Sequence, residues 1–307
     1  MANDNLTVSV FELQQLFPDQ EAARFYLEAR LFRDGAKCPE CKGADRITTR
    51  KGGYYRCNKC KVDFTVRTGT IFERSHVPLN KWLWAIYLLV TSRKGISSLQ
   101  LSKEIGITQK SAWFLLQRLR EACGNEMEAL RGVVEIDETH IGGKEKNKHR
   151  NKRLKVGQGY SGKVTVMGMR EVGGRTYAKP VEGTTRAHLR GEVLLRVEAG
   201  STVCTDEAPA YDGLRRFYPK HHKVSHTQGE YVRDGLGTQG IESVWAVLKR
   251  GLHGTYHHAS KKHMARYVNE FTFRLNAGNV KQHTIHRLNA LVDSTAGKRI
   301  TYKDLTA

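Results

Sequence analysis

The sequence of 307 residues has no long hydrophobic run, few cysteines and far fewer acidic than basic residues. Its most apolar stretch, residues 82–90, is much shorter than the ~20 apolar residues that a membrane-spanning helix needs. The polar residues 1–6 lack the basic and apolar regions of a signal peptide. We therefore expect a cytoplasmic protein in a reducing environment, with no membrane partner.

The shortage of acidic residues leaves a strongly basic chain. There are 31 Asp and Glu against 51 Lys and Arg, which gives a net charge of +20, and the basic residues are spread along the whole sequence. A polyanion explains this excess, because each phosphate that a basic side chain neutralises releases counterions. The alternative is a basic protein without a polyanion partner. We favour a nucleic acid as the partner.

Most of the six cysteines occur in two Cys-x-x-Cys pairs with 15 residues between them. The paired residues are Cys38, Cys41, Cys57 and Cys60. Two turns with this spacing can present four thiolates at the corners of a tetrahedron, which is the usual ligand set of structural Zn²⁺. Two disulfides in a secreted protein are the alternative. We predict a zinc ribbon over residues 35–76, whereas Cys123 and Cys204 are expected to be buried thiols.

Apolar residues at helical spacing indicate a helical segment over residues 1–34 and a helical bundle over residues 77–131. In the bundle, a short helix ends at Gly106 and Thr108 caps the next one, which is typical of a DNA-binding helix-turn-helix. The pattern alone is weak, because many helical hairpins share it. The positions expected to be exposed on the second helix are Gln109, Lys110, Ser111, Gln117, Arg118 and Arg120. Of these, the predicted DNA contacts are Gln109, Lys110, Ser111 and Arg118, with Trp113 beside them.

Strand and helix patterns follow each other over residues 132–280, which predicts an α/β layer with mixed connections, and residues 281–307 are left as a C-terminal tail. A basic run over residues 144–155 is predicted to be a mobile loop that becomes ordered on phosphate. Its predicted DNA contacts are Lys148, Arg150, Lys152 and Arg153.

Three acidic residues lie among apolar neighbours: Asp137 in one strand, Asp206 at the end of another, and Glu242 in a helix. A buried carboxylate is costly unless something pairs with it, and a shared divalent cation is one solution. Two such cations would activate a water or a 3′-hydroxyl and stabilise the leaving oxygen of a phosphodiester. The alternative is that each acid caps a strand or pairs with an arginine.

Lys249 lies seven positions after Glu242, on the same face of the predicted helix, where it could hold a substrate phosphate. Lys249 and Arg250 could equally serve as the cationic end of that helix. The histidines of residues 253–263 fit no closed zinc ligand set, so we favour phosphate or DNA contacts over a second metal site. His140 is expected to contact the site locally because it is close to Asp137.

The chain resembles the ISXO-like transposases of bacterial insertion sequences in its motifs and their order. These are the helical start, the ribbon, the helix-turn-helix, and the motifs around Asp137, Asp206 and Glu242-Ser-Val-Trp-Ala-Val-Leu-Lys249. Those proteins carry a zinc ribbon ahead of a DDE catalytic domain. The 35 residues between Asp206 and Glu242 agree with many DDE recombinases. One departure is Gln239, where relatives often carry Asn three residues before the glutamate.

The resemblance implies a multidomain chain of α+β and α/β parts, in which an RNase H-like domain brings Asp137, Asp206 and Glu242 onto two Mg²⁺ ions, with Mn²⁺ able to substitute. Lys249 would be the basic catalytic residue. It also implies cleavage at the terminal inverted repeats of an element and strand transfer into target DNA by a dimer or larger multimer in the bacterial cytosol. The alternatives from other classes are a non-catalytic DNA-binding regulator and a nuclease of RNA hybrids.

Overall fold

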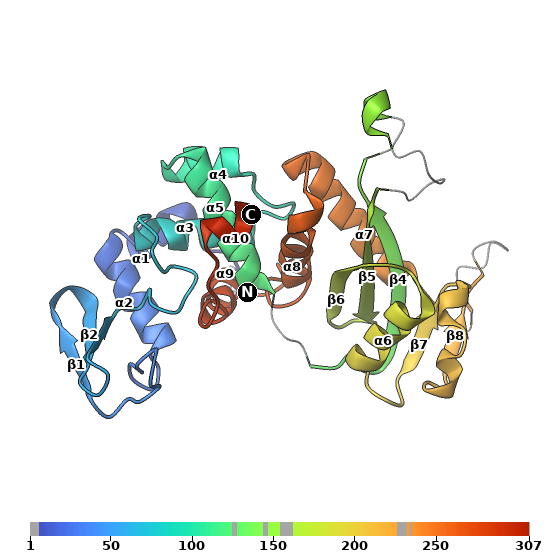
Figure 1. Cartoon of the computed structure of the whole chain (residues 1–307), viewed down its shortest axis with the longest axis horizontal. Coiled ribbons are helices and arrows are strands. Elements are labelled where there is room, and N and C mark those ends of the chain that lie inside the picture. The colour runs from blue at the N-terminus through green and yellow to red at the C-terminus, as the bar shows by residue number, and fades with distance from the viewer. Residues whose placement is uncertain are drawn as a thin grey trace, which may run out of the picture. The chain divides into compact units, whose positions relative to one another are not determined.

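The computed structural model describes residues 6–124, 128–143, 147–153, 162–225, 232–233 and 235–306, and the chain divides into two compact units (Figure 1). The first unit combines residues up to 125 with residues from 277 onward, and the second comprises residues 126–276. No helix in the described ranges is both long and apolar enough to cross a membrane.

Two helices and a small sheet begin the first unit. Helix α1 (Val10–Leu16) starts with a capping box, in which Ser9 and Glu12 each accept a backbone N–H of the other residue. Helix α2 (Gln20–Leu31) is capped by Asp19. Strands β1 (Ile47–Arg50), β2 (Tyr54–Cys57) and β3 (Val62–Phe64) then form an antiparallel sheet, as a zinc ribbon requires.

A helical bundle completes the first unit. Its helices are α3 (Leu79–Thr91), α4 (Ser98–Ile105), α5 (Gln109–Cys123), α9 (Thr284–Asp293) and α10 (Tyr302–Thr306). Gly106 ends α4 with a left-handed backbone (φ 62°), and the side chain of Thr108 caps α5. The α4–α5 pair therefore has the form of the predicted helix-turn-helix.

Helix α5 is more deeply buried than the sequence suggested. Gln117 is 0 % exposed, Arg118 6 % and Arg120 1 %, so the expectation that these three side chains face solvent is wrong. The guanidinium of Arg118 donates to the carbonyls of Ile71 (2.7 Å) and Glu73 (2.8 Å). It also lies over the ring of Phe114. Arg118 holds the preceding loop, and its buried guanidinium does not favour the DNA contact predicted for it.

Residues 281–306 are folded onto the bundle. Helix α9 packs on α2 and α3. Beyond it, the ammonium of Lys298 donates to the carbonyls of Glu121 (3.2 Å), Ala122 (3.0 Å) and Gly124, at the C-terminal end of α5. The ring of Tyr302 meets Phe114 edge-on. The segment predicted as a tail thus contacts α5 near both of its ends.

The second unit is built on a five-stranded mixed sheet with the strand order β6-β5-β4-β7-β8. The strands are β4 (Val133–Ile141), β5 (Val164–Glu171), β6 (Thr176–Val181), β7 (Thr202–Thr205) and β8 (His221–Lys223). Strand β5 is antiparallel to both β4 and β6, whereas β4, β7 and β8 run parallel. A short hairpin, β9 (Val232–Arg233) with β10 (Leu236–Gly237), precedes the last helices.

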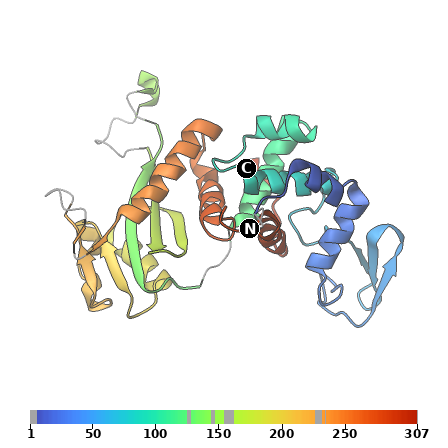
Figure 2. The same cartoon turned by 180° about the vertical axis from the view of Figure 1, so that it is seen from behind.

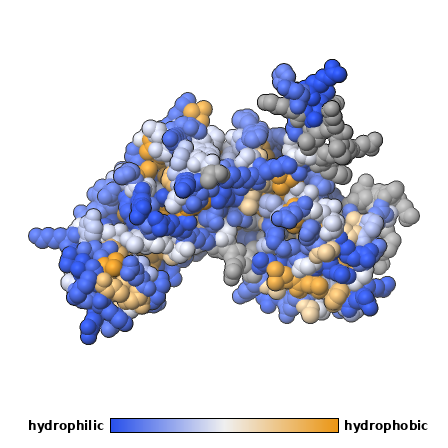
Figure 3. All heavy atoms as spheres, viewed as in Figure 1, coloured by the Kyte–Doolittle hydropathy of each residue, from blue (hydrophilic) through white to orange (hydrophobic). Residues whose placement is uncertain are grey.

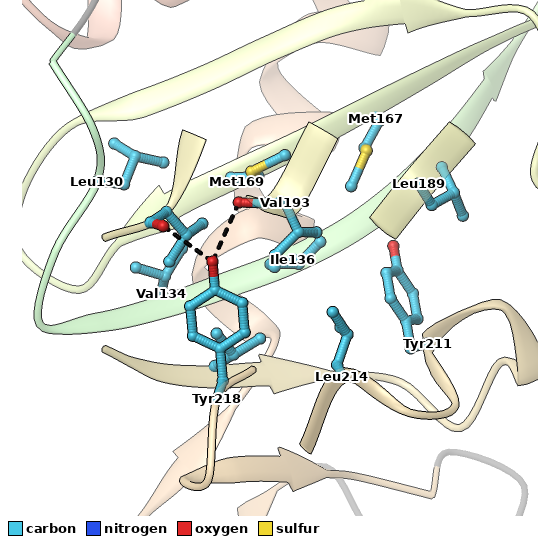
Figure 4. Close-up of a cluster of buried hydrophobic side chains, with 12 residues drawn as sticks. Leu130, Val134, Ile136, Met167, Met169, Leu189, Val193, Tyr211, Leu214 and Tyr218 are labelled. Atoms are coloured by element: carbon cyan, nitrogen blue, oxygen red, sulfur yellow. Dashed lines mark hydrogen bonds between the residues drawn. The ribbon is translucent and has the colours of Figure 1, made fainter. Parts of the chain in front are cut away.

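Helices cover both faces of this sheet. Helix α6 (Arg186–Arg196) packs on one face, whereas α7 (Gln239–Gly251) and α8 (Met264–Leu275) pack on the other (Figure 1 and Figure 2). In the core beneath α6, the hydroxyl of Tyr218 donates to the carbonyls of Val193 (3.3 Å) and Val197 (2.8 Å) (Figure 4). This arrangement is consistent with an RNase H-like domain. The predicted fold class is therefore confirmed.

Alternation along the central strands decides which side chains meet α7. Val134 and Ile136 of β4 lie in the core on the α6 face, so Glu135 and Asp137 are directed to the α7 face. On the surface shown in Figure 3, hydrophilic residues predominate and apolar patches are small. One apolar pair, Leu194 and Leu195, is exposed on α6.

Candidate metal centre and active site

The four paired cysteines converge in the ribbon, where their sulfur atoms all lie within 4.8 Å of one another. Each pair is followed by a lysine with a left-handed backbone, Lys42 (φ 60°) and Lys61 (φ 59°), which is an uncommon conformation for a residue other than glycine. The two turns therefore bend so that both pairs face the same point. Aromatic rings of Phe32, Tyr55 and Phe64 pack beside the cluster.

Electrostatics favour a cation among these sulfurs. The backbone N–H of Gly43 lowers the pKa of Cys41 to about 7. The neighbouring Cys41 thiol raises the pKa of Cys60 to about 12, because two adjacent thiols resist ionising together. A divalent cation would remove this conflict, and a set of four sulfurs suits Zn²⁺. The cluster thus fits structural zinc, as the spacing predicted.

The second site lies where β4 and β7 run side by side. Their parallel register pairs Glu135 with Cys204, and Asp137 and Asp206 each follow these paired residues by two positions. The carboxylate of Asp206 accepts the N–H of Ala208 (3.0 Å), so the chain turns immediately after the strand. Two of the three predicted carboxylates thus emerge from adjacent strands.

Helix α7 brings the third carboxylate to the same place. Trp245 donates its indole N–H to Asp137 Oδ2 (2.9 Å), and Glu242 lies one helical turn before Trp245. The helix approaches closely because Gly168 lies opposite Asp137 on β5. A Cβ atom at Gly168 would be 2.4 Å from the Trp245 ring, which leaves no space for a side chain.

The resulting site is electrostatically strained in the absence of a cation. Burial raises the pKa of Asp137 to about 6, and repulsion by Asp206 and Glu242 adds to the rise, whereas the N–H groups of Glu138 and Trp245 oppose it. The carboxylates do not approach one another as closely as the four cysteines, which form the single cluster of that kind within the described ranges. An all-oxygen donor set of this kind suits Mg²⁺, which retains several waters, better than Zn²⁺.

Two further residues were predicted near the site, His140 and Lys249. Alternation along β4 directs His140 to the same face as Ile136, opposite to Asp137. Burial lowers the pKa of His140, and the positive charges of Lys163 and Lys249 lower it further. His140 also shares a hydrogen bond with Thr165 (3.1 Å). Lys249 itself is exposed on α7, and Gln239 is exposed at the first position of that helix.

The histidines after α7 lie at or near the surface. His253, His257 and His258 are exposed and His263 is half-buried. None of them belongs to a metal-binding cluster in the part of the chain that the structure describes.

The predicted DNA contacts have different environments. Gln109 and Lys110 are exposed in the first turn of α5, although Gln109 donates to Ser98 (2.8 Å) and Lys110 lies over the ring of Tyr302. Ser111 is half-buried.

In the basic run of the second unit, Arg150 and Arg153 are exposed and Lys148 is half-buried. The side chain of Lys152 and much of the remaining run, including residues 144–146 and 154–155, lie outside the described residues.

Three residues around the acidic site were not identified from the sequence. Glu135 is buried and accepts the backbone N–H of Ile241 (2.6 Å), which attaches β4 to the start of α7. Glu138 accepts the hydroxyl of Tyr211 on the opposite face, and burial raises its pKa to about 7. In the sequence, Trp245 is one of the apolar residues that surround Glu242. Its hydrogen bond to Asp137 joins residues 108 positions apart, so no local pattern shows it.

Comparisons with known proteins identify two family domains in the chain. Residues 129–276 match the ISXO2-like transposase domain, and residues 18–62 match the transposase zinc-ribbon domain. A protein of Halobacterium salinarum described as "Uncharacterized protein in transposable element ISH50" is 29 % identical over 272 residues, which is 83 % of this chain and 90 % of that protein.

Among solved structures, a chain from the "CryoEM structure of simian T-cell lymphotropic virus intasome in complex with PP2A regulatory subunit B56 gamma" shares 14 % identity with a TM-score of 0.28. The match covers 61 % of the present chain and 65 % of the solved one.

Proposed function

We propose that this chain, which carries an ISXO2-like transposase domain and a transposase zinc ribbon, cuts DNA at the terminal inverted repeats of an insertion sequence and joins the ends to target DNA. The observation that supports this most directly is the convergence of Asp137, Asp206 and Glu242 from two adjacent strands and one helix. Three carboxylates in one partly buried site are unfavourable unless a cation binds there.

These carboxylates would hold Mg²⁺, or Mn²⁺ in its place. When bound, the metal would supply Lewis-acid activation of a water or a 3′-hydroxyl and stabilisation of the leaving oxygen. The residues themselves position the reaction. Trp245 fixes the orientation of the Asp137 carboxylate through its indole N–H. Lys249, exposed on α7 seven residues after Glu242, is suited to hold a phosphate of the DNA beside the carboxylates.

DNA recognition would belong mainly to the first unit. The zinc ribbon and the exposed first turn of α5, with Gln109, Lys110 and Ser111, would contact the element ends. In the second unit, Lys148, Arg150, Lys152 and Arg153 would bind DNA phosphates. Two element ends have to be brought together for joining, so the working form would be a dimer or a larger multimer in the cytosol.

A joining assay tests this function. Purified protein is mixed with Mg²⁺, duplexes carrying the DNA ends that flank its gene, and a supercoiled target plasmid. We expect joined product from the wild type and none from Asp206→Asn, which should still bind the duplex because only a carboxylate charge is removed. Asp212→Asn is the matched control, since Asp212 is an exposed acid of the same unit that pairs with Lys223.

Two results would contradict the proposal. Specific binding without cleavage under any divalent cation would indicate a DNA-binding regulator. Joining that survives in Asp206→Asn would remove Asp206 from the catalytic site.

A further inference from the structure

Helix α7 carries Glu242 in its first turn, and the start of this helix is held by a residue from a distant strand. The side chain of the N-cap residue Thr238 caps no backbone N–H, and its hydroxyl donates to Glu242 Oε1 (3.2 Å). Instead, the carboxylate of Glu135 on β4 accepts the N–H of Ile241 at 2.6 Å. Glu135 is only 8 % exposed, so this bond is shielded from competing water. A tertiary contact thus performs the task that a local cap performs in most helices.

Gly240 makes this contact possible. A Cβ atom at position 240 would lie 2.3 Å from Glu135 Oε2 and 2.9 Å from Glu135 Cδ. Any other residue would therefore push the carboxylate away from the start of the helix. The glycine in the first turn of α7 is explained by this close approach, because its side-chain space is occupied by Glu135.

A second side chain holds the same helical turn. Arg170 of β5 lies directly opposite Glu135 in the β4–β5 register. Its guanidinium donates to the carbonyl of Gly240 (2.5 Å) and to the hydroxyl of Ser243 (3.1 Å). Glu135 therefore binds an N–H of the first turn while Arg170 binds a carbonyl and a hydroxyl of it. Together they fix both the position and the rotation of the helix end.

Glu135 and Arg170, together called the clamp, lie beside Asp137 and Glu242, two of the proposed metal ligands. Glu135 precedes Asp137 by two residues, so the two side chains share one face of β4. Gly240 precedes Glu242 by two residues in the turn that is held. We propose that Glu135 and Arg170 are positioning residues that set the location of Glu242 relative to Asp137. This inference rests on the proposed function, since it assigns a purpose to that geometry.

The Mn²⁺ requirement for DNA joining distinguishes a role of Glu135 in positioning Glu242 from a role in the stability of the fold alone. We expect Glu135→Ala and Gly240→Ala to lower kcat for DNA joining ~100-fold, the usual effect of a misplacement of about 1 Å, with little change in KM for DNA. Both variants should need more Mn²⁺ for half-maximal joining, and each should bind Mn²⁺ more weakly in electron paramagnetic resonance titrations without DNA. Glu135→Gln retains an oxygen acceptor and should lose less.

The matched control is Glu171→Gln. Glu171 is another carboxylate of the sheet that accepts backbone N–H groups, from Arg131 (2.9 Å) and Arg175 (3.0 Å), away from α7. Its replacement should cost stability without changing the Mn²⁺ requirement. All variants are assayed as full chains below their own melting temperatures. If Glu135→Ala fails to fold, Gly240→Ala reports the same displacement with the carboxylate still present.

The outcomes separate the two proposals. Wild-type kcat and wild-type Mn²⁺ affinity in Glu135→Ala or in a folded Gly240→Ala would overturn the clamp and leave the proposed function intact. An equal shift in the Mn²⁺ requirement of Glu171→Gln would also overturn it, because the effect would then be one of general stability. A wild-type protein that neither joins DNA nor binds Mn²⁺ would overturn the proposed function and the clamp with it.

Discussion

A methyl group added at Gly168 tests how closely α7 must approach the sheet. A Cβ atom there would lie 2.4 Å from Cη2 of Trp245 and 3.0 Å from Cδ1 of Ile241, well inside the ~3.5–4.0 Å at which carbon atoms pack. Trp245 cannot turn aside without breaking its bond to Asp137. In Gly168→Ala, the helix must therefore move away from β5 and take Glu242 with it.

The expected magnitude follows from two effects. Overpacking a well-packed core costs about 1–3 kcal/mol. Losing or stretching the bond from Trp245 to the carboxylate of Asp137 costs about 1.5–3 kcal/mol. We expect Gly168→Ala to lower the free energy of unfolding of the second unit by about 3 kcal/mol, and to lower the joining rate ~100-fold through misplacement of Glu242.

Hydrogen exchange of peptides from β4 and β5 measures this stability locally, which matters because a chain of two units need not unfold in one step. The control is Gly191→Ala, in a helical position where no atom lies within 4 Å of the added Cβ. It should stabilise α6 by up to ~1 kcal/mol and leave joining unchanged. Wild-type exchange and wild-type joining in Gly168→Ala would refute the close approach of α7.

Three further predictions concern other parts of the molecule. Burial lowers the pKa of His221 to about 4, so the folded protein, which holds His221 neutral, loses stability as the pH falls below the ordinary histidine pKa of 6.5. From pH 7 to pH 5, the free energy of unfolding of the wild type should fall by about 2 kcal/mol more than that of His221→Asn. Equal losses in urea titrations of the two proteins would contradict this. Cys57→Ser, or zinc removal by a chelator, should unfold the ribbon and abolish specific end binding while circular dichroism of the second unit persists; unchanged end affinity would argue against the ribbon as a DNA reader. Arg118→Met should lower the melting temperature, because the carbonyls of Ile71 and Glu73 lose their donor, and should leave the DNA affinity of the folded protein unchanged. Lys110→Ala should weaken DNA binding without lowering the melting temperature. The opposite pattern in binding isotherms would indicate that Arg118 contacts DNA.

The features that the sequence predicted well are those encoded by short spacings. The zinc cluster follows from two Cys-x-x-Cys turns, and the structure brings all four sulfur atoms together. The end of α4 follows from Gly106, and the start of α5 from Thr108. Asp137 and Asp206 could be selected because carboxylates are rare at apolar strand ends, and both follow the paired residues Glu135 and Cys204 of two neighbouring parallel strands.

The features that the sequence did not reveal depend on contacts between distant segments. Burial of α5 arises partly from Lys298 and Tyr302, which lie more than 170 residues later and had been assigned to a tail. Glu135 lies between the apolar residues Val134 and Ile136, which is the pattern of a polar residue facing solvent. Helix α7 packs on that face of the strand and buries Glu135. Alternation gives the face of a side chain but not what covers it.

The central claim is that Asp137, Asp206 and Glu242 hold the divalent cation that acts on DNA, and exchanging the ligand atom tests it most directly. Asp206→Cys replaces a carboxylate oxygen with sulfur, which Mg²⁺ accepts poorly and Mn²⁺ accepts more readily. We predict that this variant joins no DNA ends with Mg²⁺ and recovers part of the joining activity with Mn²⁺, whereas Asp206→Ala remains inactive with both. Wild-type joining by Asp206→Cys in Mg²⁺, or equal activity of the two variants in Mn²⁺, would contradict the account.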